Sequence, residues 1–323
     1  MAQGNRTRIA RRALHGVLLL DKPLGWSSND ALQKAKWLLR AEKAGHTGTL
    51  DPLATGLLPL CFGAATKFSQ ISLDADKAYR ATLRLGQRTS TGDREGAVIA
   101  ERPVQVDAAT IQATIARFTG PIAQLPPMHS ALKKDGKALY EYARAGEVVQ
   151  RAPRQVQIHA IDMVSWQDAE LVLDVRCSKG TYIRTLAEDI GEALGCGAHL
   201  SALRRTASGP LTLAGTVTLA NLEAMDEPAR QALLQPVDAL LADWPTTTLD
   251  ATEAGRFLTG LRRRLLLPDQ PALRVYGPEP GAFLGSAHIT AGELIPDRLL
   301  SPAEVQALLS PIQHPAPEPL QAA

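Results

Sequence analysis

The 323-residue sequence predicts an α+β fold arranged in about two domains. Along residues 10–245, strand-length apolar runs and helical stripes follow one another without a strict βαβ alternation, which favours an α+β body. After Trp244 the composition shifts toward Thr, Pro and Gly, and residues 246–315 have the features of a small β-rich domain. Hydrophobic residues make up 45% of the chain, enough for an ordinary packed core. We expect residues 1–9 and 316–323 to be disordered.

The first predicted elements are a buried strand and an amphipathic helix. Gly16 to Leu20 is a continuous apolar run that stops at a charged turn before Pro23, as a buried strand would. Ser27 or Ser28 can cap the helix that follows, and Gly45 is its expected end. The apolar stripe of this helix consists of Leu32, Ala35, Leu38 and Leu39.

The remaining elements alternate between short strands and helices. Asp107 is expected to cap a helix that ends at Gly120, and residues 183–194 have the spacing of another helix. Helical signals also span residues 219–241. Near the end of the chain, Ser301-Pro302 with an acid at position 304 is a good helix start. The predicted strands are residues 57–62, 78–86, 97–101, 156–165 and 171–177.

The composition is typical of a cytoplasmic protein. No apolar run approaches the ~20 residues of a membrane span, and no secretory h-region follows the N-terminus. The three cysteines are widely spaced and odd in number, which favours buried reduced thiols over disulfides or a zinc site. Net charge is only +2, yet residues 1–50 carry nine basic and three acidic side chains. That imbalance suits a face that binds a polyanion, although a solvated surface also explains any single charge.

Residues 121–154 form an unusual basic segment. Prolines lie at both ends, and tyrosines 140 and 142 are interleaved with basic side chains. Such a segment is either an excursion from the core that contacts nucleic acid or a solvated helical hairpin, and composition favours neither.

The stretch GHTGTLDPLATG at residues 45–56 gathers small polar residues around one carboxylate. Pro52 biases Asp51 toward an extended or turn conformation, and the flanking glycines allow unusual backbone angles. Asp51 therefore lies on a rigid loop, where it serves as a nucleophile, a general base, or simply the side chain of an Asx turn. An aspartyl phosphatase motif is excluded because His46 and Thr47 stand where its acid is required. No dinucleotide, Walker or zinc-protease motif occurs, so we expect neither a cofactor nor a metal.

Several ordered stretches resemble the bacterial tRNA pseudouridine-55 synthase family (TruB). HTGTLDPLATGLLPLCFGAATK, at residues 46–67, resembles the catalytic motif, and GVLLLDKPLGWSSND resembles the N-terminal motif. AYRATLRLGQRTSTGDREG resembles the strand and loop that bear the active-site tyrosine. PPMHSALKKDGKALYEYARAGE resembles the RNA-gripping thumb, and CSKGTYIRTLAEDIGEALGCGAHLSALRRT the last catalytic motifs. The resemblance implies a mixed, mainly antiparallel pseudouridine synthase core with flanking helices, a thumb insertion at 121–154, and a PUA-like RNA-binding domain at 246–315.

The resemblance also implies an activity. The chain is expected to be an RNA pseudouridine synthase, an intramolecular isomerase that converts uridine 55 in the T-loop of tRNA into pseudouridine. Such an enzyme detaches the uracil, turns it, and rejoins it to the same sugar through carbon 5 without a cofactor. The expected partner is the T-arm of tRNA, bound by a monomer that needs no obligate protein partner and no membrane.

By the same resemblance, Asp51 is the catalytic carboxylate, and Arg184 pairs with it to keep it ionised and oriented. Tyr79 is expected to lie against the target uracil and to handle the proton leaving carbon 5. Tyr182 and Leu203 are expected to line the same pocket.

The remaining site residues are implied to bind RNA or support the site. The target base must be flipped out of the folded loop, and His46 would fill the vacated stack or else only order the loop. Lys22 would support the loop, contact the RNA backbone, or contact Asp51, and Asp93 is an acid near the pocket. The basic side chains expected to bind RNA phosphates are Lys67, Lys133, Lys134 and Arg144.

Two alternatives to this function remain. A catalytically silent member would act only as an RNA-binding chaperone, but the intact Asp51, Tyr79 and Arg184 argue against silence. Guide-dependent relatives of archaea and eukaryotes act on other RNAs with partner proteins, whereas the long thumb-like segment suits an enzyme that holds its own RNA. One departure from some relatives is Met128-His129 in the thumb.

Overall fold

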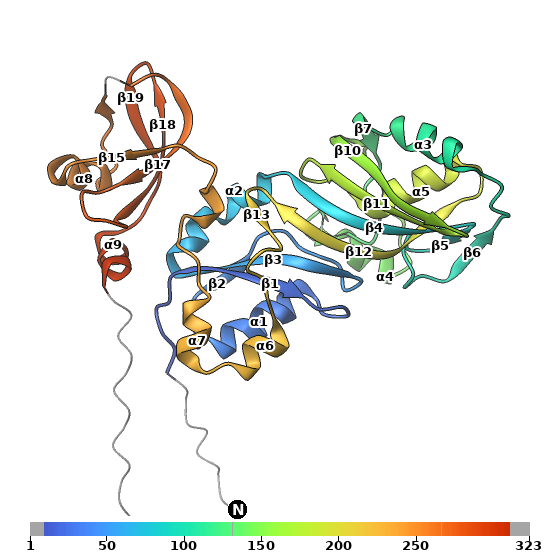
Figure 1. Cartoon of the computed structure of the whole chain (residues 1–323), viewed down its shortest axis with the longest axis horizontal. Coiled ribbons are helices and arrows are strands. Elements are labelled where there is room, and N and C mark those ends of the chain that lie inside the picture. Colours follow the sequence, from blue (N-terminus) through green and yellow to red (C-terminus); the bar gives the residue numbers. More distant parts are fainter. Residues whose placement is uncertain (1–9, 131, 266, 311–323) are drawn as a thin grey trace, which may run out of the picture.

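The computed structural model describes residues 10–130, 132–265 and 267–310. Figure 1 shows a long curved sheet with helices on its flanks and a smaller β-rich unit beside one end of the sheet. The predicted disorder of residues 1–9 and 316–323 concerns segments outside the described residues. No helix in the described part of the chain is both long and apolar enough to cross a membrane.

A ten-stranded sheet forms the body, in the order β14-β1-β3-β12-β4-β11-β10-β7, with β2 on β3 and β13 on β12. Two of its pairings, β1 with β14 and β3 with β12, are parallel, and the others are antiparallel. The predicted α+β class with a mixed, mainly antiparallel sheet is therefore confirmed. The strands are β1 (Gly16–Lys22), β2 (Ala44–His46), β3 (Ala54–Phe62), β4 (Lys77–Leu85), β7 (Gly120–Gln124), β10 (Arg154–Gln167), β11 (Glu170–Cys177), β12 (Ala198–Ser208), β13 (Leu211–Thr212) and β14 (Val217–Thr218).

The central strand β12 was not predicted. It lies between β3 and β4 and joins the two halves of the sheet. Its two register shifts against β4 break the regular alternation that marks a strand in a sequence. The adjacent arginines 204 and 205 further obscure the apolar pattern. The strands predicted near β1, β3, β4, β6 (Val98–Glu101), β10 and β11 are all present; β6 pairs with β5 (Gln87–Thr89) outside the main sheet.

Local capping signals gave the helix starts more reliably than the ends. Ser27 caps α1 (Ser28–Leu38), and Asp107 caps α3 (Ala108–Ala116). The predicted end of α1 at Gly45 is wrong, because Arg40 adopts a positive φ of 51° and the chain then enters β2. Gly120 likewise does not end α3 but begins β7. Helix α5 (Ile183–Ala193) begins one residue after Tyr182.

Two apolar clusters hold helices against the sheet. One packs α1 and α6 (Leu219–Ala224) on β1 and β3, and the other packs α3 and α5 on β4, β10 and β11. Tyr79 and Leu203 contact both clusters, so they lie at the seam between them. Figure 1 shows this division, with α1, α6 and α7 (Glu227–Ala232) at one end and α3 and α5 at the other.

The C-terminal unit is β-rich, as predicted. It contains a five-stranded sheet in the order β15-β17-β18-β19-β16. Its core is continuous with that of the main body, because Phe68, on the first short helix after β3, lies 5.3 Å from Phe283 between ring centroids. Its elements are β15 (Thr246–Thr248), α8 (Ala251–Leu258), β16 (Arg263–Arg264), β17 (Gln270–Tyr276), β18 (Phe283–Thr290), β19 (Glu293–Leu299) and α9 (Pro302–Leu309). The capping box predicted for α9 is present at Ser301 and Glu304.

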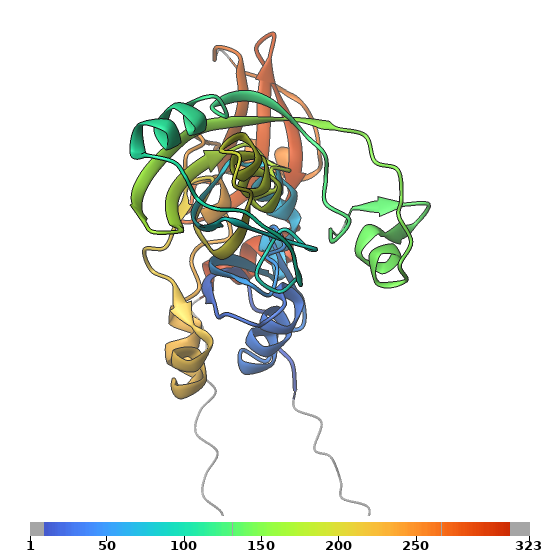
Figure 2. The same cartoon turned by 90° about the vertical axis from the view of Figure 1, so that its right-hand side faces the viewer.

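The segment predicted as a thumb projects from the body. It carries a two-stranded hairpin, β8 (Lys133–Lys134) with β9 (Lys137–Ala138), followed by α4 (Leu139–Arg144). Figure 2 shows this hairpin and α4, in green, set apart from the sheet. The remaining short helices are η1 (Gly63–Phe68), α2 (Ser69–Asp74) and η2 (Ala239–Leu241). The three cysteines are free and buried, as expected.

Candidate active site

Hydrogen bonds from a side chain and from the main chain hold the loop between β2 and β3 in place. The Ser28 hydroxyl accepts a hydrogen bond from the Leu50 amide at 2.8 Å and lies 3.1 Å from the Leu50 carbonyl. The Gly25 amide donates to the Pro52 carbonyl at 2.9 Å. Gly48 adopts a φ of 79°, a left-handed conformation that favours glycine. These contacts hold Asp51 on a rigid, non-helical loop.

The Asp51 carboxylate faces Arg184, which α5 supplies from its first turn. The Oδ2 of Asp51 lies 2.9 Å from Nη2 of Arg184. The Arg184 side chain is 7% exposed and that of Asp51 44% exposed, so the carboxylate opens toward solvent while its partner does not. This ion pair, implied earlier by resemblance, makes an Asx turn an unsuitable description of Asp51.

Three further groups fix the Arg184 guanidinium. It donates to the carbonyls of His129 at 2.6 Å and Thr91 at 3.4 Å. Asp93 lies 3.6 Å from Nη1 and is itself held by the Thr91 hydroxyl at 2.6 Å. Asp93 was expected near the pocket; it is buried, and it stands behind Arg184, where it balances that buried charge.

A charged neighbour of Asp51 partly offsets the effect of burial on the pKa of its carboxyl. Removal of water raises the pKa of the Asp51 carboxyl, the nearby Asp93 charge adds to the rise, and Arg184 opposes it. The N-terminal end of α5 also points positive backbone dipoles toward this region. The ion pair therefore retains a carboxylate where a solvent-poor cleft would otherwise neutralise it.

A cavity of about 180 Å³ opens over this ion pair. Asp51, Tyr79, Tyr182, Arg184 and Leu203 all line it, which brings together five residues predicted from the sequence. Burial raises the pKa of both tyrosines, so both phenols are neutral near neutral pH. Aromatic and aliphatic walls around one ion pair form a small chamber suited to a flat polar ring.

Gln124 holds the backbone of Tyr182, which lines the cavity, and this role was not predicted. Its side-chain oxygen accepts from the Tyr182 amide at 3.0 Å, and its amide nitrogen donates to the Tyr182 carbonyl at 3.3 Å. These two bonds tie the end of β7 to the start of α5. A lone glutamine carries no signal of such a role in a sequence.

His46 and Lys22 lie beside the loop rather than on the cavity wall. Burial and the nearby Arg205 charge lower the pKa of His46, which keeps its imidazole neutral. Lys22 is fully buried, and its ammonium donates to the carbonyls of Trp26 at 2.6 Å and Pro23 at 3.0 Å. Burial lowers the pKa of Lys22 to about 8. Of the three roles considered for Lys22, these contacts fit support of the turn that packs on the Asp51 loop.

Lys67 lies at the junction with the C-terminal unit and not at the cavity. Its ammonium contacts the Glu304 carboxylate at 2.6 Å and the Leu299 carbonyl at 3.0 Å. In this structure the Lys67 ammonium is directed into this contact, and its binding to an RNA phosphate stays a prediction. By contrast, Lys133, Lys134 and Arg144 are exposed on the projecting thumb.

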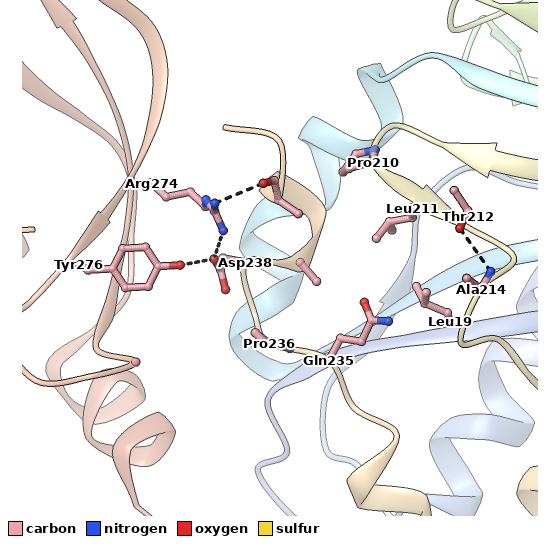
Figure 3. A pocket seen from close by; sticks show the side chains of 13 residues that line it. Leu19, Pro210, Leu211, Thr212, Ala214, Gln235, Pro236, Asp238, Arg274 and Tyr276 are labelled. Atoms are coloured by element: carbon pink, nitrogen blue, oxygen red, sulfur yellow. Dashed lines mark hydrogen bonds and ion pairs between the residues drawn. The ribbon is translucent and has the colours of Figure 1, made fainter. Parts of the chain in front are cut away.

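A larger cavity, of about 530 Å³, lies between the main body and the C-terminal unit. Figure 3 shows Arg274 and Tyr276 extending from β17 toward Asp238. The Asp238 carboxylate contacts Arg274 at 2.9 Å and accepts a hydrogen bond from the Tyr276 hydroxyl at 2.5 Å. The charged side chains that line this larger cavity are thus paired with one another across the junction. Asp51 is not among the residues that line it. The smaller cavity is the better candidate for chemistry.

Comparison with protein families identifies this arrangement. Residues 36–183 match the model of the TruB family pseudouridylate synthase N-terminal domain. Residues 184–242 match the tRNA pseudouridylate synthase B C-terminal domain, and residues 245–300 match the pseudouridine synthase II TruB C-terminal model. The chain belongs to the TruB family of pseudouridylate synthases.

Full-length relatives support this TruB assignment. The tRNA pseudouridine synthase B of Verminephrobacter eiseniae is 59% identical over 317 residues, covering 96% of both chains. That of Ralstonia pickettii is 63% identical over 303 residues, covering 90% of this chain and 95% of the relative. A solved chain in a Cbf5–Nop10–Gar1 complex has a TM-score of 0.69 at 24% identity and covers 93% of this chain and 91% of that chain. The last likeness shows the fold alone.

Within this TruB site, two further supports escaped prediction besides Gln124. Ser28 was recognised only as a helix cap, yet its hydroxyl holds the loop that carries Asp51. Arg205 stood in the motif ALRRT without an assigned role, yet it is almost fully buried beneath the loop. Both contacts join residues far apart in the chain, and local patterns carry no information about them.

Proposed function

We propose that this TruB-family chain isomerises uridine 55 in the T-loop of tRNA to pseudouridine, with Asp51 as the essential catalytic carboxylate. The observation that carries the proposal is the Asp51–Arg184 ion pair at 2.9 Å, placed in a small cavity walled by Tyr79 and Leu203. Identities of 59–63% to enzymes named tRNA pseudouridine synthase B support the same activity.

The proposed roles follow from where each side chain lies. Arg184 keeps Asp51 charged and directs one carboxylate oxygen toward the cavity. Tyr79 and Leu203 pack against the extruded uracil, and Tyr182 lines the same cavity. The bond between uracil N1 and the ribose carbon breaks, the uracil turns, and a bond from carbon 5 to the same ribose carbon forms. Carbon 5 loses its proton, with Tyr79 handling it, and N1 takes up a proton, so the product is an isomer of the substrate. His46, neutral and beside the loop, fills the stack that the flipped base leaves.

The thumb supplies the main grip on RNA in this proposal. Two of its cations stand beside aromatic rings: the half-buried Lys137 lies 4.3 Å from the Tyr142 ring centroid, and the exposed Arg144 lies 5.2 Å from that of Tyr140. Such a surface binds phosphates through charge and bases through stacking. We assign the thumb to residues 121–154 and a supporting RNA-binding role to residues 246–315. The enzyme acts as a cytoplasmic monomer without an obligate protein partner.

The decisive test is tritium release from unmodified tRNA labelled at carbon 5 of its uridines, in the presence of EDTA and without added cofactor. Wild-type protein should release one tritium per tRNA. Asp51→Asn should release none while its tRNA affinity stays within about tenfold, or ~1.4 kcal/mol. Product formation by a well-folded Asp51→Asn would refute the assignment of Asp51. Tight RNA binding without any release by wild type would instead favour a chaperone or another RNA substrate.

A further inference from the structure

Arg205 on β12 is a buried cation without a carboxylate partner. It is 1% exposed, which makes it one of the largest fully buried side chains. None of the ion pairs among the described residues includes it. Burying an unpaired charge is strongly unfavourable unless hydrogen bonds satisfy its donors.

The guanidinium links the start of the Asp51 loop to strand β3, which follows that loop. Its Nε donates to the Leu57 carbonyl at 2.8 Å, and its Nη2 donates to the Gly48 carbonyl at 3.1 Å. These carbonyls lie three residues before Asp51 and six residues after it. A Cβ atom at Gly48 would stand 3.1 Å from Nη1 of Arg205, so the loop rests directly on the guanidinium. Arg205 therefore holds the loop in place from strand β12 of the sheet.

The same side chain faces Tyr79. Arg205 and Tyr79 are paired residues on the neighbouring strands β12 and β4, so their side chains project from the same face of the sheet. Burial lowers the pKa of Arg205, and Tyr79 is the group that opposes this effect. In return, Arg205 opposes the rise that burial causes in the pKa of Tyr79. The other groups acting on the Tyr79 phenol are Cys177 from β11 and Asp51 from the loop, and both favour its neutral form.

We propose that Arg205 is a positioning residue for the pseudouridine synthase reaction, holding the Tyr79 phenol and the Asp51 loop in one arrangement and stabilising negative charge on the phenol oxygen. The inference rests on the proposed function for its relevance to catalysis. A guanidinium suits this task because its rigid fork contacts three sites at once, whereas an ammonium is a point charge. Since Arg205 is buried, it acts through Tyr79 and the loop and not on the RNA.

Three variants separate this role from that of a simple structural anchor. Arg205→Gln removes the charge, and Arg205→Lys keeps the charge but loses the fork. Arg204→Gln is the matched control: Arg204 is the neighbouring residue of β12, but it forms an ion pair with Asp21 at 2.7 Å instead. Circular dichroism and thermal unfolding establish that each variant is folded.

The first measurement is the ultraviolet titration of the Tyr79 phenol, isolated from the other four tyrosines by subtracting the same titration in Tyr79→Phe. Arg205→Gln should raise the pKa of Tyr79, Arg205→Lys should raise it less, and Arg204→Gln should leave it unchanged. This measurement needs no RNA, so it decides the Arg205–Tyr79 coupling even if the proposed function fails. An unchanged Tyr79 titration in a folded Arg205→Gln would overturn the proposal.

The second measurement is the rate of pseudouridine formation. Arg205→Gln should lower kcat by at least about tenfold, with KM changed by less than about threefold, and Arg205→Lys should recover part of kcat. If Arg205→Gln does not fold, Arg205→Lys is compared in wild-type and Tyr79→Phe backgrounds. Its effect should shrink when the phenol is absent; equal effects in both backgrounds would show that Arg205 does not act through Tyr79. Inactive wild-type protein would count against the proposed function alone.

Discussion

Replacement of Arg184 by methionine removes the partner of Asp51 while keeping a long side chain of similar reach. The structure gives Arg184 four polar neighbours: Asp51 at 2.9 Å, Asp93 at 3.6 Å, and the carbonyls of His129 at 2.6 Å and Thr91 at 3.4 Å. Methionine satisfies none of them, so the substitution affects both the fold and the chemistry.

The loss of stability comes chiefly from Asp93. Removing one partner of a buried ion pair costs about 3–5 kcal/mol, because the remaining charge is left uncompensated. Asp93 is buried but still accepts from the Thr91 hydroxyl and the Glu95 amide, which favours the lower end, ~3 kcal/mol. The Asp51 side chain is 44% exposed, and its share is therefore at most ~1 kcal/mol. Urea unfolding should show this loss in its midpoint, with an unchanged slope.

The chemical effect has a definite sign in pH. Only the ionised Asp51 can act as a nucleophile or base, and Arg184 lowers the pKa of a carboxyl that burial raises. Arg184→Met should therefore raise this pKa further, so that activity disappears at a higher pH on acidification. At neutral pH we expect a fall in the single-turnover rate of about 10²-fold or more, the usual effect of losing one preorganised charge at a reaction centre.

Single-turnover tritium release, measured from acid to neutral pH with saturating enzyme, separates this effect from RNA binding. Arg184→Lys is the control: it keeps a positive charge but reaches fewer partners, so its acid limb should move less. An acid limb that stays in place or moves to lower pH in a folded Arg184→Met would refute the electrostatic role of this pair.

Three further predictions concern the thumb, the loop and the junction between the units. Lys133→Ala combined with Lys134→Ala should weaken tRNA binding and reduce the slope of log K against log salt by about 1.5. Arginine at both positions should preserve the slope. An unchanged slope in the alanine variant would remove the thumb from the RNA contacts. Ser28→Ala leaves the buried Leu50 amide without its partner, so it should lower the free energy of unfolding by about 1–3 kcal/mol. It should also lower kcat by a larger factor than it raises KM, and equal factors for kcat and KM would argue against loop positioning. Phe68→Ala opens a cavity in the core shared with the C-terminal unit and should cost about 3–5 kcal/mol of stability in calorimetry, and a value near zero would show that the units do not share a core.

The parts of this fold that could be predicted from the sequence were those with local causes. Ser27, Asp107 and Ser301 each accept a backbone hydrogen bond at a helix start, and a cap requires only neighbours within one turn. The strand faces of β11 were equally visible, because alternate apolar residues must share a side. The end of α1 was misplaced because no glycine or proline marks it, and Arg40 itself adopts the left-handed turn.

Site residues could be predicted from the sequence where they lie in a long motif. They could not be predicted where their role depends on burial in the folded protein. Asp51, Tyr79 and Arg184 were singled out by residue type within long motifs, and the structure brings them to one cavity. For Lys22 the sequence left open whether it supports the loop, contacts RNA or contacts Asp51, and Lys67 was expected to contact RNA, because a sequence does not show which partner a lysine finds. In the fold one is buried against carbonyls and the other is paired with Glu304.

By itself, the sequence determined the fold class, the positions of most strands and helix starts, and the loop that displays a carboxylate before Pro52. These depend on backbone preferences and periodicity, which act between neighbours in the chain. Tertiary structure alone decided the partner of each charge, the central place of β12, and the burial of Arg205 beneath the catalytic loop. The physical reason is that desolvation and ion pairing depend on groups brought together from distant segments, and no local pattern specifies which groups those are.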